Sequence, residues 1–124
     1  MNDRQKSPQQ LDQITTAIIS AWHEGHGGSA DQAYIFQGDE GIVVMIPKAL
    51  YQAELNLLHN YSSGSKLLDR YLRSLLETVA IEVSLDIEEC LNKKIAEAIP
   101  LVDMSAGWAI IFYRFDNSPE NNGQ

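Results

Sequence analysis

The stretch of residues 66–91 constrains the fold of this chain more than any other. Read at helical spacing, its apolar side chains form one stripe, with charged side chains off it. The stripe consists of Leu68, Leu72, Leu75, Leu76, Val79, Val83, Ile87 and Cys90. This i, i+3, i+4 recurrence predicts an amphipathic helix about 39 Å long. A helix of this length cannot bury its own stripe, so the rest of the chain must cover it.

The segments before this helix predict another helix and a β-hairpin. Ser7 can cap a helix whose first residue is Pro8, and Gly25 is a natural stop for it. Residues 33–37 and 42–46 are β-prone runs separated by a turn-forming segment. A short loop between two such runs predicts an antiparallel hairpin.

The rest of the chain predicts a short helix and a second hairpin. The short helix covers residues 48–60, with inward side chains at Leu50, Leu57 and Leu58, joined by Ala53 and Leu55. A turn over residues 61–65 follows, and Ser65 can cap the N-terminus of the long helix. Asn92 can end that helix by adopting the left-handed conformation. Residues 95–102 read as an extended segment in which Pro100 indicates an edge or a bulge, and residues 108–115 form the clearest strand.

These elements predict an α+β fold with one domain over residues 7–115. An antiparallel sheet of about four strands, made of two hairpins, is expected to pack against the long central helix, beside an N-terminal helix and a short second helix. The strand side of that contact is expected at Val44, Ile46, Ile110 and Phe112. Residues 1–6 and 116–124 are polar and are expected to be disordered.

Charge and cysteine usage restrict the classes of partner. The 124 residues carry 17 acidic and 9 basic side chains, for a net charge of −8. This balance argues against nucleic acid and against anionic lipid headgroups, and a basic surface on another protein fits it better. One cysteine excludes an internal disulfide, and no secretory signal or apolar run of about 20 residues is present. We therefore expect a cytoplasmic protein that does not insert directly into a membrane.

The segment His23-Glu24-Gly25-His26 superficially resembles the helix motif of zinc proteases. The protease motif places its histidines four residues apart on one helical face, whereas here they are three apart. Zinc would also need a third protein ligand, for which His59 and Cys90 are available. A solvated helix end is therefore preferred, and a metal site at His23 and His26 is the alternative.

The glycine-rich loop at residues 25–29 offers backbone N–H groups that could hold an anion. It follows a helix rather than preceding one, and it lacks the lysine and hydroxyl of a P-loop. A sharp chain reversal is the preferred interpretation, with a binding role for His26 as the alternative. No serine lies in a nucleophile-elbow context, so we expect no catalytic residues, cofactor or enzymatic activity.

The order of several weak motifs over residues 10–115 resembles one family of small cytoplasmic proteins. Its first loop matches at Gly25-His26-Gly27-Gly28, its second helix at Leu50 to Glu54, and its long helix at Arg73-Ser74-Leu75-Leu76-Glu77. Asn92-Lys93-Lys94-Ile95, Asp103 and Ile110-Ile111-Phe112-Tyr113 match the remaining motifs. This pattern resembles the MpsC family, named after a protein encoded beside a sodium-translocating, membrane-potential-generating system. The chain departs from the pattern at Gly28, Tyr51 and Asn92, where the family has proline, a capping threonine and glycine.

The resemblance implies a non-enzymatic accessory protein linked to membrane ion or inorganic-carbon transport. It makes the matched positions candidates for contacts with a ligand or partner, namely Gly25, His26, Gly27, Glu54, Arg73 and Asp103. We expect protein–protein contact with a transport complex from the cytoplasmic side, and a homo-oligomer, specifically a dimer, formed through the helix or a sheet edge. A small-molecule sensor with a cleft between the sheet and the second helix, and a metal- or nucleotide-dependent enzyme built on the glycine-rich loop at residues 25–29, are the alternatives.

Overall fold

A computed structural model of the chain describes residues 8–27, 32–60, 62–103 and 105–117. Three helices and four strands follow one another as α1 (Pro8–His26), β1 (Tyr34–Gln37), β2 (Gly41–Ile46), α2 (Gln52–Asn60), α3 (Ser62–Leu91), β3 (Ile95–Asp103) and β4 (Trp108–Phe115). The strands form one antiparallel sheet in the order β1-β2-β4-β3, which contains the two predicted hairpins. The predicted α+β class is confirmed.

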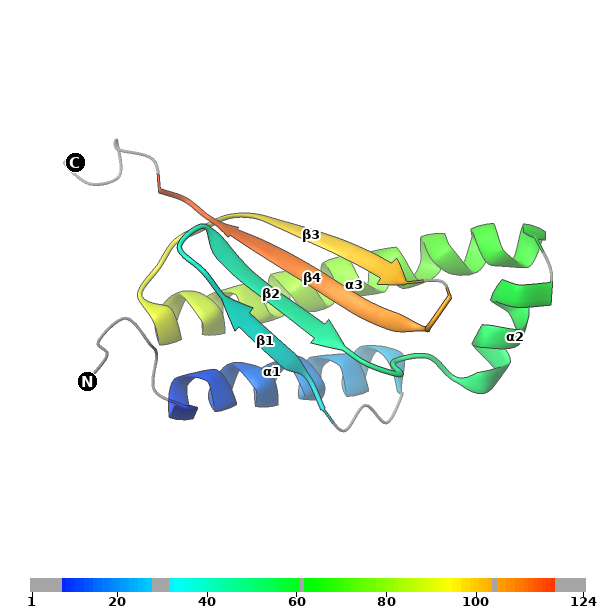
Figure 1. Ribbon diagram of the computed structural model, residues 1–124, viewed down its shortest axis with the longest axis horizontal. Helices are drawn as coiled ribbons and strands as arrows, with labels where there is room; N and C mark the ends of the chain where they lie inside the picture. Colours follow the sequence, from blue (N-terminus) through cyan, green and yellow to red (C-terminus); the bar gives the residue numbers. More distant parts are fainter. Residues whose placement is uncertain (1–7, 28–31, 61, 104, 118–124) are drawn as a thin grey trace.

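Helices α1 and α3 lie side by side against one face of the sheet, and the other face of the sheet is turned toward the viewer in Figure 1. Helix α2 packs against α3 at the end of the sheet where the β3–β4 turn lies (Figure 1). Within the described segments, no helix combines the length and apolar character needed to cross a membrane.

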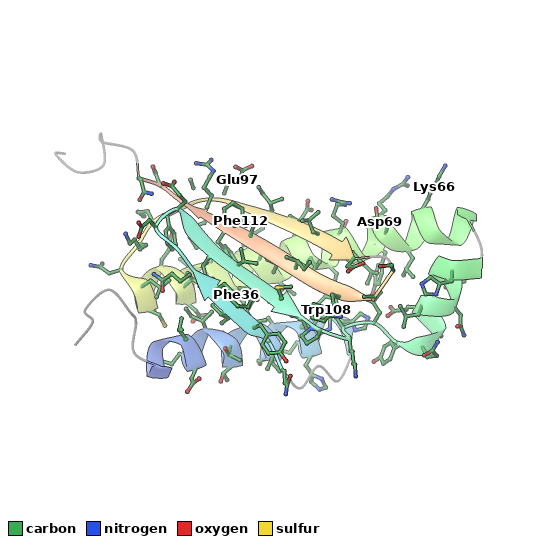
Figure 2. The ribbon with its side chains drawn as sticks, in the orientation of Figure 1. Phe36, Lys66, Asp69, Glu97, Trp108 and Phe112 are labelled. Carbon is green, nitrogen blue, oxygen red and sulfur yellow. The ribbon has the colours of Figure 1, made fainter. Side chains whose placement is uncertain are left out.

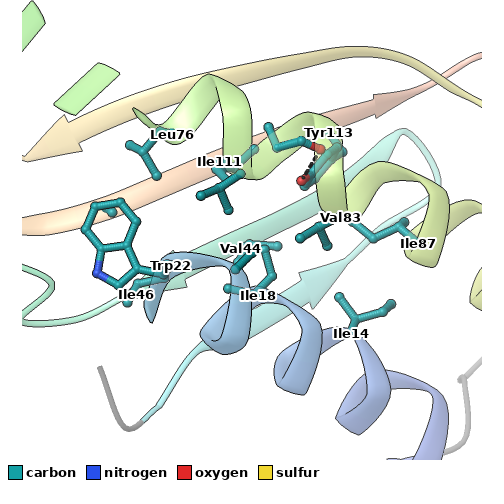
Figure 3. Packing of buried hydrophobic residues seen from close by; sticks show 14 of the residues in the cluster. Ile14, Ile18, Trp22, Val44, Ile46, Leu76, Val83, Ile87, Ile111 and Tyr113 are labelled. Carbon is teal, nitrogen blue, oxygen red and sulfur yellow. Dashed lines mark hydrogen bonds between the residues drawn. The ribbon is translucent and has the colours of Figure 1, made fainter. Parts of the chain in front are cut away.

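The core lies between the helix pair and the sheet (Figure 3). The predicted stripe of α3 is confirmed, because Leu72, Leu76, Val79, Val83 and Ile87 are fully or almost fully buried, while Leu68, Leu75 and Cys90 are partly buried and pack against the core. Alternate residues of β2 and β4 face this stripe: Ile42, Val44, Ile46, Ala109, Ile111, Tyr113 and Phe115. Helix α1 contributes Ile14, Ile18 and Trp22, and each such side chain is worth about 1.5–3 kcal/mol on full burial.

The expectation that Ile110 and Phe112 face the long helix is wrong. Val43 lies opposite Phe112 and Met45 lies opposite Ile110 in the β2–β4 ladder, whereas the buried Val44 lies opposite Ile111. Successive side chains of a strand point to opposite sides of a sheet. Val44 and Ile46 therefore face the helices as predicted, and Ile110 and Phe112 lie on the other side.

Three predicted helix boundaries also need correction. Helix α1 continues through Gly25 to His26, and Gly27 (φ +80°) takes the left-handed stop position. Helix α2 begins at Gln52 rather than at residue 48, because Lys48 itself has φ +53°. Helix α3 begins at Ser62, so residues 62–65 of the predicted turn are helical and Ser65 lies inside the helix rather than at its start.

The predictions for the helix stop at Asn92 and for Pro100 are confirmed, whereas those for the second helix are confirmed only in part. Asn92 (φ +55°) is the left-handed stop of α3, and Pro100 lies in the edge strand β3, as expected. Of the side chains predicted to face inward, Leu50 just before α2 is buried in the core and Leu55 packs against it, whereas Leu57 is 42% exposed and Ala53 is exposed. The side chain of Leu58 lies outside the described part. Ser7, residues 1–6 and most of the predicted tail, at 118–124, fall outside the described residues.

Candidate functional site

The described residues of the predicted loop, Gly25, His26 and Gly27, lie where the end of α1 meets the start of α2. The Nε2 atom of His26 is 2.9 Å and 3.0 Å from the two carboxylate oxygens of Glu54. The imidazole stacks between the rings of Trp22 and Tyr51, at centroid distances of 4.5 Å and 4.9 Å. Its side chain is only 1% exposed, so His26 is a buried packing residue rather than part of a solvated helix end.

Glu54 and Tyr51 complete this junction. The Tyr51 backbone N–H donates to Glu54 Oε1 at 2.8 Å, which is the glutamate half of a capping box. The Tyr51 hydroxyl donates to the carbonyl of Gly27. The structure thus brings His26, Gly27 and Glu54 together, in an arrangement that fastens two helices. Within the described segments, His26 Nδ1 is buried without a hydrogen-bond partner.

The other predicted site residues, Gly25, Arg73 and Asp103, form no hydrogen bond or ion pair with Glu54 in the described part of the chain and have local roles. A Cβ at Gly25 would lie 3.1 Å from Leu75 Cδ1, so this glycine permits close approach of α1 and α3. Arg73 forms an exposed ion pair with Asp69 at 3.4 Å, one helical turn away, worth about 0.3–0.5 kcal/mol.

Asp103 shapes the turn between β3 and β4. Its Oδ1 atom accepts hydrogen bonds from the Ser105 hydroxyl and backbone N–H, at 2.9 Å and 3.0 Å, and from the Ala106 N–H at 3.2 Å. These bonds, with the Ser105 hydroxyl first, hold the pKa of Asp103 below its usual value. The carboxylate is therefore committed to the turn.

The metal alternative, with Cys90 as a possible ligand, finds little geometric support. Over residues 8–27, 32–60, 62–103 and 105–117, no three His, Cys, Asp or Glu side chains gather as a metal site would require. The Cys90 thiol donates to Gln13 Oε1 at 3.2 Å. Burial, and then the charges of Asp86 and Glu89, raise the pKa of Cys90, which disfavours the reactive thiolate.

The sheet face turned away from α1 and α3 carries a continuous apolar surface, which we call the open face. Strand register gives its two central rows, Phe36–Val43–Phe112–Ile99 and Tyr34–Met45–Ile110–Leu101. Trp108 extends it at one end. Figure 2 shows Phe36, Phe112 and Trp108 on this side of the sheet. All four strands contribute, so the surface exists only in the folded sheet.

The open face is accessible to a partner. Phe36 is 58% exposed, Leu101 48%, Tyr34 45% and Ile99 37%, and the other members are partly buried. Charged groups flank it, with the Arg114–Glu97 ion pair (3.0 Å) at one end and Asp103 beside Trp108 at the other. Among the described elements, no helix lies over it (Figure 1). Contiguous exposed apolar patches of this kind mark interaction sites.

Sequence reasoning missed this surface, although β2 and β4 carried a signal for it. Both strands are apolar at nearly every position, without the polar alternation of a sheet that has one solvated face. That pattern indicates two covered faces, while the chain supplies described helices for only one.

Comparison of the chain with protein-family models, with curated protein sequences and with solved structures finds no match.

Proposed function

We propose that the protein is a non-enzymatic binding module whose open face takes up an amphipathic segment of a protein partner. In line with the resemblance to the MpsC family, the partner belongs to a membrane ion or inorganic-carbon transport complex, met from the cytoplasmic side. The observation that carries the proposal is the apolar face of nine side chains across all four strands.

The shape of the open face favours a protein segment over a small molecule. Four strands spaced about 4.8 Å apart present a surface roughly 15–20 Å wide. Its apolar residues lie in two rows that cross the strands, and a helix laid on a sheet can bury such rows. Small-molecule sites are usually concave and enclose most of the ligand.

Charge narrows the chemistry of the partner. The chain has a net charge of −8, so a partner segment with basic residues flanking its apolar stripe gains favourable long-range attraction. We therefore assign the open face to an amphipathic, basic-margined segment, and not to an acidic segment or a nucleic acid.

Affinity capture with matched variants tests this proposal. Purified wild-type chain, a Phe36→Ser/Leu101→Ser variant and a Leu57→Ser control are incubated with solubilised membranes, and captured proteins are identified by mass spectrometry. Leu57 is a suitable control because it is 42% exposed and lies on α2, away from the open face. We expect a transport subunit with wild type and control, and its loss with the open-face variant.

Binding is then measured with the purified subunit. A dissociation constant raised at least about tenfold by the open-face variant, and unchanged in the control, supports the proposal, because two apolar contacts are removed. Equal capture by all three chains, or recovery of no membrane protein by any of them, contradicts it.

A further inference from the structure

The outward side of α3 carries a second apolar stripe, which we call the outer seam. It consists of Leu67, Tyr71, Ser74, Thr78, Ile81 and Leu85. The successive intervals alternate between four and three residues, as in a coiled-coil seam. Its large members are all exposed: Leu67 66%, Tyr71 51%, Ile81 71% and Leu85 67%.

The outer seam points away from the core. At about 100° per residue, its members lie roughly opposite the buried stripe of Leu72, Leu76, Val79 and Val83. Helix α1 shows the contrast, because its exposed positions Asp12, Thr16, Ser20 and His23 are polar. An apolar outward stripe is therefore specific to α3 within this helix layer.

The outer seam is symmetric about Leu76. Leu67 and Leu85 are equally far from residue 76 in sequence, as are Tyr71 and Ile81, and Ser74 and Thr78. When two copies of α3 pack antiparallel and cross at the level of residue 76, each seam residue of one copy lies beside its partner in the symmetric pair on the other copy. Leu67 of one copy then lies beside Leu85 of the other. The small Ser74 and Thr78 then lie at the centre, where the helices approach most closely, and the large side chains pack on either side.

Charge along α3 selects the same antiparallel orientation. Between residues 66 and 75 the helix carries Lys66, Arg70 and Arg73 with one acidic residue, Asp69. Between residues 77 and 91 it carries five acidic residues and no lysine or arginine. Antiparallel packing places the basic half of each copy beside the acidic half of the other, whereas parallel packing would place like charges together.

We infer that two copies of this chain associate through their outer seams, with their α3 helices antiparallel about a two-fold axis near Leu76. Such an isologous contact is the commonest form of homodimer. The seam is about 27 Å long, and one pair of helices in contact over that length buries less than the roughly 1,200–2,000 Å² of a standard stable interface. The dimer therefore exchanges with monomer, and it forms whether or not the open face is occupied.

Sedimentation equilibrium over a wide concentration range tests this association. We expect a monomer–dimer equilibrium in wild type, and in Ile81→Glu a dissociation constant raised by more than about a hundredfold, because symmetry applies the change twice. Thr16→Glu, on the outward side of α1, and Phe36→Ser, on the open face, are expected to leave the equilibrium unchanged. Monomer at every concentration, or a dimer lost in Phe36→Ser but kept in Ile81→Glu, overturns the inference.

Disulfide trapping tests the orientation. In a Cys90→Ser background, an equal mixture of Leu67→Cys and Leu85→Cys chains is oxidised mildly. The antiparallel arrangement predicts cross-links between a Leu67→Cys chain and a Leu85→Cys chain. It predicts almost no cross-links when either variant is oxidised by itself. Efficient cross-linking of Leu67→Cys with itself would show parallel packing and overturn the assignment. Unchanged circular dichroism in each variant confirms that the fold is retained.

Discussion

At the scale of single residues, Tyr113 couples stability to alkaline pH. Its side chain is fully buried, and its hydroxyl donates to the carbonyl of Ala80 at 3.0 Å (Figure 3). Burial, followed by the charge of Asp86, raises its pKa far above the ordinary value of 10.0. Because the pKa of Tyr113 is higher in the folded than in the unfolded chain, its protonated hydroxyl stabilises the fold fully below pH 10. This stabilisation is lost as the pH rises further. We expect the free energy of unfolding to fall by up to about 1.4 kcal/mol per pH unit above pH 10.

Tyr113→Phe isolates this effect in urea unfolding between pH 8 and pH 11. The variant is expected to be about 0.5–1.5 kcal/mol less stable at pH 8, because the hydrogen bond to Ala80 is lost. Above pH 10 the difference narrows and then reverses, since phenylalanine has no proton to lose. Parallel pH profiles for the two proteins would refute the assignment.

At the scale of elements, strand alternation decides what a substitution in the sheet does. Leu76→Asp places a charge at a fully buried position of α3, and we expect it to unfold the domain, whose total stability is of the order of 5–15 kcal/mol. Phe112→Asp changes the open face, where the carboxylate can reach water. We expect the fold to persist with a loss of about 1–3 kcal/mol, since the Phe112 ring also packs over Gly41.

Circular dichroism and thermal melting distinguish the two variants. A cooperative transition in Phe112→Asp, with none in Leu76→Asp, is the expected result. Equal loss of structure in both would mean that Phe112 belongs to the core facing the helices, which would contradict the strand register.

The elements themselves could be predicted where periodicity was strong. The α3 stripe, the strand at 108–115, the edge position of Pro100 and the stop at Asn92 follow from local rules and are confirmed. Element boundaries were less predictable. Gly25 reads as a helix stop, but its contact with Leu75 comes from tertiary packing that no local rule contains.

The candidate site was harder to predict than the fold. In β4 almost every residue is apolar, so the sequence alone does not decide which alternate set faces the helices, and Ile110 and Phe112 were assigned to the wrong side. The open face also needs the strand order β1-β2-β4-β3, which brings Phe36 and Ile99 into one row. Of the predicted site residues, only His26, Gly27 and Glu54 meet, and their contacts join helices.

At the scale of the whole molecule, two apolar surfaces lie on opposite sides of one small, strongly acidic domain. The open face lies on the sheet and the outer seam on the helix layer. The net charge of −8 opposes non-specific aggregation of the protein through mutual repulsion. This repulsion disappears near the isoelectric point of about 4.7, so we expect a sharp loss of solubility as the pH approaches that value.

The open face should drive this loss, because it gathers nine apolar side chains on four strands, against four large apolar side chains in the outer seam. Phe36→Ser/Leu101→Ser changes no charge and therefore leaves the isoelectric point where it is, while it interrupts both apolar rows. We expect light scattering between pH 4 and pH 6 to show markedly less aggregation in this variant, and no improvement in the Leu57→Ser control. Equal aggregation in all three chains would show that charge neutralisation alone governs solubility. It would also argue against the open face as a binding surface. A surface that binds a partner's apolar segment should attract other apolar surfaces once charge repulsion between copies is gone.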